Sequence, residues 1–340
     1  MPTGIHDLPF ELLELILEHA SRGYDLDSAK PAAARSLFLR ECSLVARQWR
    51  APAQACLWAS LRIHSPATAK KLLSSPVLGM YGTRHLDLAG VHAGGGLSGT
   101  TAARLLAKIK GVRWLRLADF GRLSARVLQH DNLRGLKTLL LMTSFPDKPA
   151  TITALRLPFH LRTLHLFNRP YAHSILSTLF AASTHSLTSL TLLTGSGSPS
   201  YATLVTAFPL VAPNLVHLSL QHRPSPAFIS SFAHLSCLAH LECHFAVDLA
   251  AVLDALPATG TLRTLAIELD YTLADVAALL VPRLAAPVLA SLQVLRIPRA
   301  PRRDEFAEFG GAALLAACAD KGVVIEIGET VAWRTRVWGD

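Results

Sequence analysis

One short phrase of apolar and polar positions recurs along most of the chain. The phrase is apolar-x-x-apolar-x-apolar, and its clear copies begin at Val112, Leu136, Leu161, Leu187, Leu215, Leu238, Leu262 and Leu292. Weaker copies flank this series around Leu86 and Ile325, and residues 61–63 are a candidate first copy. Because successive side chains of a strand point to opposite faces, each copy predicts a short strand with one buried face.

The spacing of the copies predicts a repeat architecture. Their middle apolar residues are between 23 residues apart (Leu218 to Leu241) and 30 residues apart (Leu265 to Leu295), and leucine-rich repeats span about 20–29 residues. Helical patterns between the copies cover residues 101–110, 173–182, 201–208, 227–233, 249–256, 273–280 and 306–318. We therefore expect an α/β solenoid with a parallel sheet on the concave side and helices on the convex side. A closed eight-stranded barrel is disfavoured, because barrel strands are more widely spaced along the chain.

The repeats also depart from the leucine-rich pattern that they resemble. Typical repeats carry Asn or Cys three residues after the last strand leucine, where the side chain connects the backbones of successive turns. Successive copies here have Phe120, Ser144, Arg169, Gly195 and Arg223 at that position. The solenoid is therefore expected to be irregular, with variable turns along one side.

An amphipathic pattern over residues 7–18 predicts a helix near the start of the sequence. Asp7 is suited to cap this helix, and Pro9 fits its first turn. Glutamates three and four residues apart share one solvated face, whereas Leu8, Leu12 and Ile16 belong to a wide apolar band. That band needs a cover, which is either the rest of the chain or another protein.

Three sequence pieces in this region together resemble an F-box. They are Leu-Pro-x-Glu-Leu-Leu-x-x-Ile from Leu8, Ser-Leu-Val-x-x-x-Trp from Ser43 and Leu-Trp-x-Ser-Leu-x-Ile from Leu57. The resemblance covers roughly residues 4–65 and implies a small helical bundle with a middle helix over residues 32–49. It further implies docking on a Skp-type adaptor of a cullin complex. The residues that would contact the adaptor or support that surface are Leu8, Pro9, Leu12, Leu13, Ile16, Val45 and Trp49.

The pattern divides the chain into an F-box-like helical domain over residues 4–60, a leucine-rich-repeat solenoid over residues 61–330 and a tail over residues 331–340. The third and fifth residues of each phrase are predicted to face the concave side, where solenoids usually bind partners. The strongest candidates there are His85, Asp87, Trp114, Arg116, His165, His217, His240, Glu242 and Arg296. Trp114 beside Arg116 is typical of a binding hot spot, unless a neighbouring element covers the indole. Solvated positions are expected for His165 and His217.

Composition narrows the classes of partner. The chain has 33 basic and 24 acidic residues, a net charge of +9, but the positive residues are dispersed and only three arginines lie between Arg299 and Arg303. No nucleic-acid reader motif accompanies them, so nucleic-acid binding is not expected. Five scattered cysteines favour a reducing compartment, cytoplasm or nucleus, without disulfides. The most apolar stretch, residues 273–297, is interrupted by charge and proline, so no membrane span is expected.

The candidate chemical motifs are weak. The glycine-rich loop at residues 94–101 has Thr100 where a phosphate-binding loop needs lysine. The histidines and cysteines of residues 234–244 resemble a zinc cluster in composition, but the strand phase places Cys243 and His240 on opposite faces. No hydrolase or metalloprotease motif is present in the sequence. We expect no cofactor, no metal and no catalysis by this chain alone.

Two functions remain open from the sequence. The chain is either the substrate receptor of an SCF-type ubiquitin ligase, with the repeats binding a target protein, or a scaffold whose first helices cap the exposed end of the solenoid. The two hypotheses differ in the state of Leu12 and Ile16, which a capping role would bury under the first repeat. A nucleotide-using enzyme, built on the glycine-rich loop, is a remote third reading.

Overall fold

A computed structural model describes residues 8–22, 29–90, 96–167, 171–193, 200–221, 224–244, 247–268, 273–297 and 306–327. Several positions singled out in the sequence lie outside these ranges. They are Asp7, Gly94, Gly95, Arg169, Gly195, Arg223, the arginines between Arg299 and Arg303, and the tail over residues 331–340.

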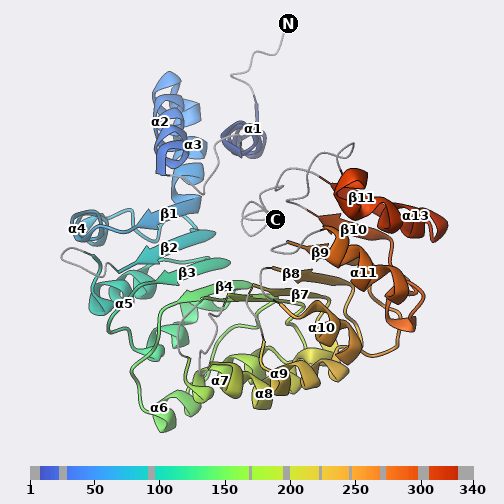
Figure 1. The fold of residues 1–340 in the computed structure, drawn as a ribbon. Helices are drawn as coiled ribbons and strands as arrows, with labels where there is room; N and C mark the ends of the chain where they lie inside the picture. Colours follow the sequence, from blue (N-terminus) through green and yellow to red (C-terminus); the bar gives the residue numbers. More distant parts are fainter. Residues whose placement is uncertain are drawn as a thin grey trace, which may run out of the picture.

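Within the described residues, the strands form a single 11-stranded sheet in the order β1 to β11 (Figure 1). The strands are β1 (Ser60–Ile63), β2 (His85–Ala89), β3 (Trp114–Ala118), β4 (Thr138–Met142), β5 (Thr163–Phe167), β6 (Ser189–Leu193), β7 (His217–Leu220), β8 (His240–Cys243), β9 (Thr264–Ile267), β10 (Val294–Ile297) and β11 (Val324–Ile327). Every neighbouring pair is parallel. The predicted strands are confirmed, including the candidate first copy at residues 61–63.

The register of the sheet follows the repeat phrase. The middle apolar residue of each copy pairs with that of the next, in a row from Leu61 through Leu86 and Leu115 to Leu295 and Ile325. Most of this row is completely buried, because each repeat covers the apolar face of its neighbour. The periodicity of the sequence therefore fixed both the strand positions and their alignment.

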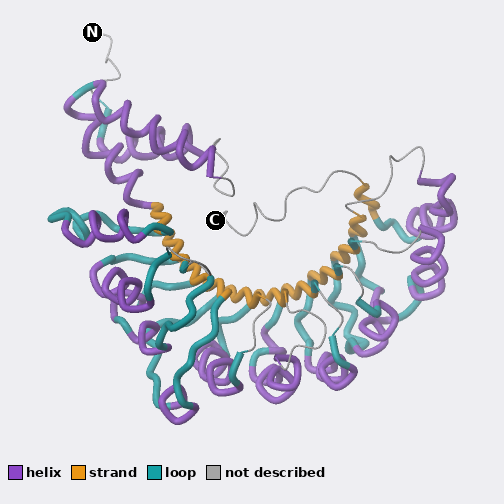
Figure 2. The backbone as a smooth tube through the Cα atoms, turned by 60° about the vertical axis from the view of Figure 1, so that its left-hand side comes forward, coloured by secondary structure: helices purple, strands orange, loops and turns teal. Residues whose placement is uncertain are grey.

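Helices on the convex side connect the strands (Figure 2). The α-helices are α4 (Pro66–Ser74), α5 (Gly99–Lys108), α6 (Pro149–Thr153), α7 (His173–Ser183), α8 (Ser200–Ala207), α9 (Pro226–Ser230), α10 (Leu249–Ala255), α11 (Leu273–Arg283) and α13 (Ala312–Asp320). Short 3-10 turns accompany them at η2 (Ala125–Gln129), η3 (Asp131–Leu133), η4 (Phe208–Leu210), η5 (Ala212–Asn214), η6 (Ser231–His234) and η7 (Pro287–Leu289), and a π-helical turn, η8 (Ala307–Gly311), precedes α13. All seven predicted helical stretches are helical in the structure, whereas α4 and α6 were not predicted. Both helices begin with proline in the first turn. Proline marks a helix start, but it adds nothing to the apolar periodicity from which the other helices were predicted.

Three helices precede the sheet: α1 (Phe10–Arg22), α2 (Ala29–Val45) and α3 (Arg47–Ala59). We call them the helical unit. The prediction of one middle helix over residues 32–49 is wrong, because Ala46 adopts extended backbone angles (φ −152°, ψ 153°) and separates α2 from α3. Trp49 consequently belongs to α3, which continues directly into β1 at Ser60.

The two regions have separate cores. A continuous apolar core runs through the solenoid from Ile63 to Val323. The helical unit has a small core of its own, formed by Leu17, Leu39, Cys42, Ala53 and Cys56. Among the described residues, no helix has the length and apolarity that crossing a bilayer requires.

The missing Asn or Cys of the leucine-rich pattern has a substitute at the other end of the strand. Ser186, one residue before its repeat phrase, donates to the carbonyl of Leu161 in the preceding repeat (2.7 Å). Thr261 stands at the same position and donates to the carbonyl of Leu238 (2.9 Å). Asn214 also stands there and reaches back to the preceding repeat. Polar side chains one residue before the repeat phrase therefore connect successive turns in this irregular solenoid.

Candidate interaction surfaces

The helical unit exposes a band of apolar side chains. Leu12 is 46% exposed, Ile16 43% and Val45 68%. Phe10, Leu15, Leu37 and Leu44 are also exposed and were not among the predicted contact residues. Exposed large apolar side chains of this kind make the band a candidate protein-interaction surface.

The other predicted adaptor residues have different environments. Pro9 is exposed, and Leu8 and Trp49 are half-buried, while the indole nitrogen of Trp49 is buried without a hydrogen-bond partner. Leu13 is only 2% exposed. Leu13 therefore lies beneath the exposed band and is not part of its surface, which agrees with the supporting role allowed for these residues.

The opposite side of α1 fastens the helical unit to the solenoid. Arg84, immediately before β2, forms ion pairs with Glu14 (3.6 Å) and Glu18 (3.4 Å) of α1. Tyr81 donates to Gln54 of α3 (3.1 Å), and its ring stacks on Trp58. The glutamate face, which the sequence predicted to be solvated, is therefore partly used for docking. As a result, α1 directs its acidic face to the repeats and Leu12 and Ile16 away from them.

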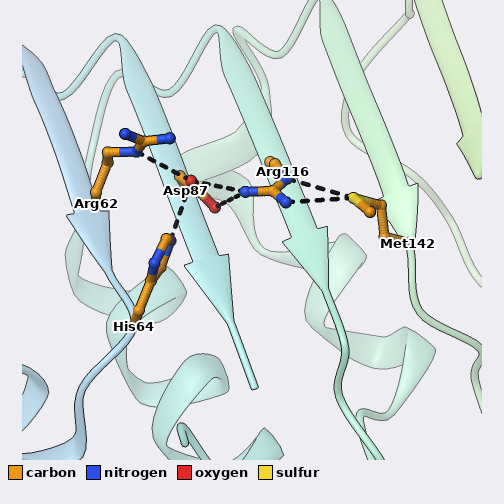
Figure 3. Close-up of polar contacts among 5 residues, drawn as sticks. All are labelled: Arg62, His64, Asp87, Arg116 and Met142. Atoms are coloured by element: carbon orange, nitrogen blue, oxygen red, sulfur yellow. Dashed lines mark hydrogen bonds and ion pairs between the residues drawn. The ribbon is translucent and has the colours of Figure 1, made fainter. Parts of the chain in front are cut away.

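A network around Asp87 occupies the first concave positions (Figure 3). The carboxylate lies 3.3 Å from Arg62 Nε, 3.0 Å from His64 Nε2 and 3.0 Å from Arg116 Nη1. Arg116 also donates to the sulfur of Met142 (3.4 Å). Burial alone would raise the pKa of Asp87, but the hydrogen bond from His64 and the positive charges of Arg116 and Arg62 lower it overall. Asp87 thus holds the first three strands together and is not accessible to a partner.

The concave candidates separate into three groups by exposure. His240 is exposed; His85, Arg116, His217, Glu242 and Arg296 are half-buried; Asp87, Trp114 and His165 are buried. The prediction of Trp114 as an exposed hot spot is wrong, since its side chain is only 5% exposed and lies beside the ring of His85. The predicted solvation of His165 is also wrong, and burial lowers the pKa of this histidine to about 4.

A second polar group spans β7 to the end of β9. His217 Nε2 lies 3.4 Å from Glu242, and His244 contacts both Glu242 and Glu268. Burial alone would raise the pKa of Glu242, but hydrogen bonds from His217 and His244 lower it. Burial likewise opposes the charged form of His244, but its bonds to the two glutamates raise its pKa overall. Glu268 was missed because it follows the last residue of its repeat phrase, one position beyond the pattern that was read. His244 occupies the same position in its own repeat and was considered only as a member of a zinc-like cluster.

A pocket of ≈ 330 Å³ lies beside this group, where β8 and β9 meet the first turns of α10 and α11. Its walls are mostly apolar, with His244 and Glu268 among the charged residues that line it. The neighbouring Cys243 is buried in the core, whereas His240 faces the concave side, and the described residues contain no group of three or more His, Cys, Asp or Glu that could hold a metal.

The glycine-rich loop is described only from residue 96 onward. Ser98 caps α5 by accepting a hydrogen bond from the Thr101 amide (3.1 Å). A Cβ on Gly99 would lie 1.9 Å from the carbonyl oxygen of Arg122, so glycine is required there by the close approach of the next repeat. Packing between repeats accounts for this glycine.

Comparisons with known proteins assign no family to this chain. No protein-family model matches the sequence, and no curated protein sequence matches it either. Among solved structures, the chain is similar to a chain in the crystal structure of the Rad7 and Elc1 complex in yeast, with 14% sequence identity and a TM-score of 0.36. That match covers 85% of this chain and 75% of the other. A likeness this weak carries no functional assignment, and the class stated here, an α/β repeat solenoid with a helical unit at one end, rests on the sheet itself.

Proposed function

We propose that this chain is the substrate-recognition subunit of an SCF-type ubiquitin ligase. The helical unit would bind a Skp-type adaptor of a cullin complex, and the solenoid would bind a target protein. The observation that carries the proposal is the exposure of Leu12 and Ile16 on the side of α1 that faces away from the repeats. The F-box resemblance of the same residues supplies the kind of partner.

The proposed mechanism is proximity. A subunit that holds a target beside a ubiquitin-loaded conjugating enzyme raises the effective concentration of the reacting groups. Such a subunit performs no chemistry itself. Two features favour a fixed geometry between the two binding surfaces. α3 enters β1 without a linker, and Arg84 joins α1 to the start of β2. The proposal includes no cofactor, and it places the protein in the cytoplasm, the nucleus or both.

The scaffold alternative uses the same contacts differently. The ion pairs between α1 and Arg84 are what a helical cap on the first repeat would form. A cap alone, however, does not account for an apolar band on the outer side of α1, which costs free energy as long as it faces water. We therefore favour the receptor function.

Adaptor capture tests the proposal. Purified full-length chain is mixed with a Skp-type adaptor, and binding is measured for wild type and for the double variant Leu12→Asp with Ile16→Asp. Both side chains are about half exposed, so the variant is expected to fold and to lose capture, because two carboxylates cannot be buried in an apolar interface.

The matched control is Met80→Asp with Leu210→Asp, which places the same charges on exposed apolar positions of the solenoid. This control is expected to capture the adaptor like wild type. Absence of capture by the wild-type chain, or equal capture by wild type and the α1 variant, contradicts the receptor function and favours the scaffold.

A further inference from the structure

A row of positive side chains lies on the edge of the sheet where the strands begin. The row consists of the residue at the second position of four successive repeat phrases, which immediately precedes β2, β3, β4 or β5. These residues are Arg84, Arg113, Lys137 and Arg162. All four are exposed. We call this row the cationic rim.

Backbone hydrogen bonds place the rim residues in register. The amide of Arg113 donates to the carbonyl of Arg84 (2.9 Å), that of Lys137 to Arg113 (2.8 Å) and that of Arg162 to Lys137 (2.8 Å). Neighbouring strands of a sheet are about 4.8 Å apart, so the four side chains start from points that extend over about 14 Å. Neighbouring members of the row are 24 to 29 residues apart in the sequence. The row is therefore created by the fold.

The rim has more positive charge than the chain itself neutralises. Arg84 is engaged by Glu14 and Glu18, but Arg113, Lys137 and Arg162 have no ion pair with any described carboxylate. Lys110 and Arg134 stand three residues before Arg113 and Lys137 in the same turns and are also exposed. Among the described residues, Arg134 is paired only with the exposed Asp131 of its own turn.

The row of positive charge is interrupted after β5, and the next positive residue at the equivalent position is Arg263 before β9. The equivalent positions before β6, β7 and β8 are Thr188, Val216 and Ala239. The neighbouring concave residues Thr138 and Thr163 are half-buried hydroxyls that can donate to a bound carboxylate or peptide carbonyl. The positive face is therefore a bounded strip beside hydrogen-bond donors.

We propose that the cationic rim binds an extended acidic segment of the target protein. This inference rests on the proposed function, because that function is what identifies the bound partner as a target protein. An extended peptide advances about 3.3 Å per residue, so about five residues follow the whole row. A nucleic-acid strand fits the strip less well, because proteins that bind single strands stack bases on exposed aromatic rings, and both Trp114 and Phe159 beside the rim are buried.

The test uses the full chain and labelled peptides of about ten residues. One peptide alternates Glu with Ser, a second replaces Glu by Gln, and a third contains phosphoserine in place of Glu. Fluorescence anisotropy is expected to show binding of the acidic peptide, none of the glutamine peptide, and weakening as NaCl rises from about 0.05 M to about 0.5 M. Stronger binding of the phosphorylated peptide would support the proposal and assign the anion to phosphate.

The rim variant is Arg113→Glu with Lys137→Glu and Arg162→Glu, and it should bind the acidic peptide at least about tenfold more weakly. The matched control, Lys70→Glu with Arg104→Glu and Arg126→Glu, makes the same change in net charge at exposed positions of the connecting segments and should bind like wild type. A third variant, with glutamine at the three rim positions, should weaken binding less than the glutamate variant. Unchanged thermal unfolding would show that all three variants fold.

Three results would overturn the proposal. They are absence of binding by wild type, equal weakening in the rim and control variants, and preferential binding of an oligothymidine of similar length. Adaptor capture by the same variants separates this inference from the proposed function. A wild-type chain that captures the adaptor and binds no acidic peptide contradicts only the inference about the rim.

Discussion

The helical unit and the solenoid are both rich in leucine, but they bury it differently. In the solenoid, each middle leucine of the repeat phrase is covered by the next repeat, and the core is continuous from Ile63 to Val323. In the helical unit, three short helices enclose a core of five residues and leave Leu12, Ile16 and Val45 exposed. Stacking lets a row of identical positions cover itself, whereas the three helices cover only part of their apolar side chains. The exposed apolar side chains of the helical unit are therefore a candidate interaction surface.

The largest effect expected from this comparison concerns the solenoid core. Leu164 is completely buried between its neighbours in the middle row, whereas Leu12 is 46% exposed. Leu164→Ala should lower the free energy of unfolding by about 2–5 kcal/mol, because it leaves a cavity in a close-packed core. Leu12→Ala should change it by no more than about 0.5 kcal/mol. Urea denaturation measures both, and equal losses would contradict the distinction between covered and uncovered leucines.

A smaller effect is expected from the buried charge that joins the first repeats. Asp87→Asn removes the negative charge shared by Arg62, His64 and Arg116. We expect a loss of about 1–3 kcal/mol at pH 7, less than for a fully buried pair, because the three cationic side chains remain partly solvated.

The same variant gives a pH dependence with a defined sign. The folded-state pKa of Asp87 is below its ordinary value, so its contribution is present above that value, near pH 4, and is lost as pH falls through the lower folded pKa. The difference in unfolding free energy between wild type and Asp87→Asn should therefore shrink below about pH 4. A difference that grows as pH falls would contradict the assignment of the network.

The smallest effect is expected at the junction of the two regions. Arg84→Ala removes ion pairs with Glu14 and Glu18 whose side chains are all partly exposed. Solvent screens such pairs, so the free energy of unfolding should fall by less than about 1 kcal/mol. Hydrogen exchange should nevertheless rise in α1 and not in β3 to β10, if the pairs hold α1 against the repeats. An unchanged α1 would show that α3 alone fixes the helical unit.

Much of the fold was predictable because one signal was repeated. Each copy of the phrase is weak alone, but ten copies with similar spacing determine strands, order and register together, and the row from Leu61 to Ile325 confirms them. The helix boundaries around Ala46 were not predictable in this way. That break occurs once, and the residue that adopts the extended conformation is an alanine, a good helix former.

The candidate surfaces were predictable only in part. Position in the phrase placed Asp87, Trp114 and His165 on the concave side, but it did not tell that neighbours bury them. Strands about 4.8 Å apart bring long side chains of one repeat over short ones of the next, as Arg62 and Arg116 do over Asp87. The cationic rim was missed for a related reason, because the arginines and lysine appear dispersed along the chain until the register aligns them.

The sequence by itself determined the alternation of buried and outward positions, the repeat length and hence the parallel solenoid. It also determined the amphipathic character of α1. Only the tertiary structure decided which outward positions remain accessible, which side of α1 faces the repeats and which distant charges become neighbours. The physical reason is that periodicity depends on local backbone geometry, whereas exposure and charge pairing depend on what adjacent repeats and helices place within a few ångströms of each side chain.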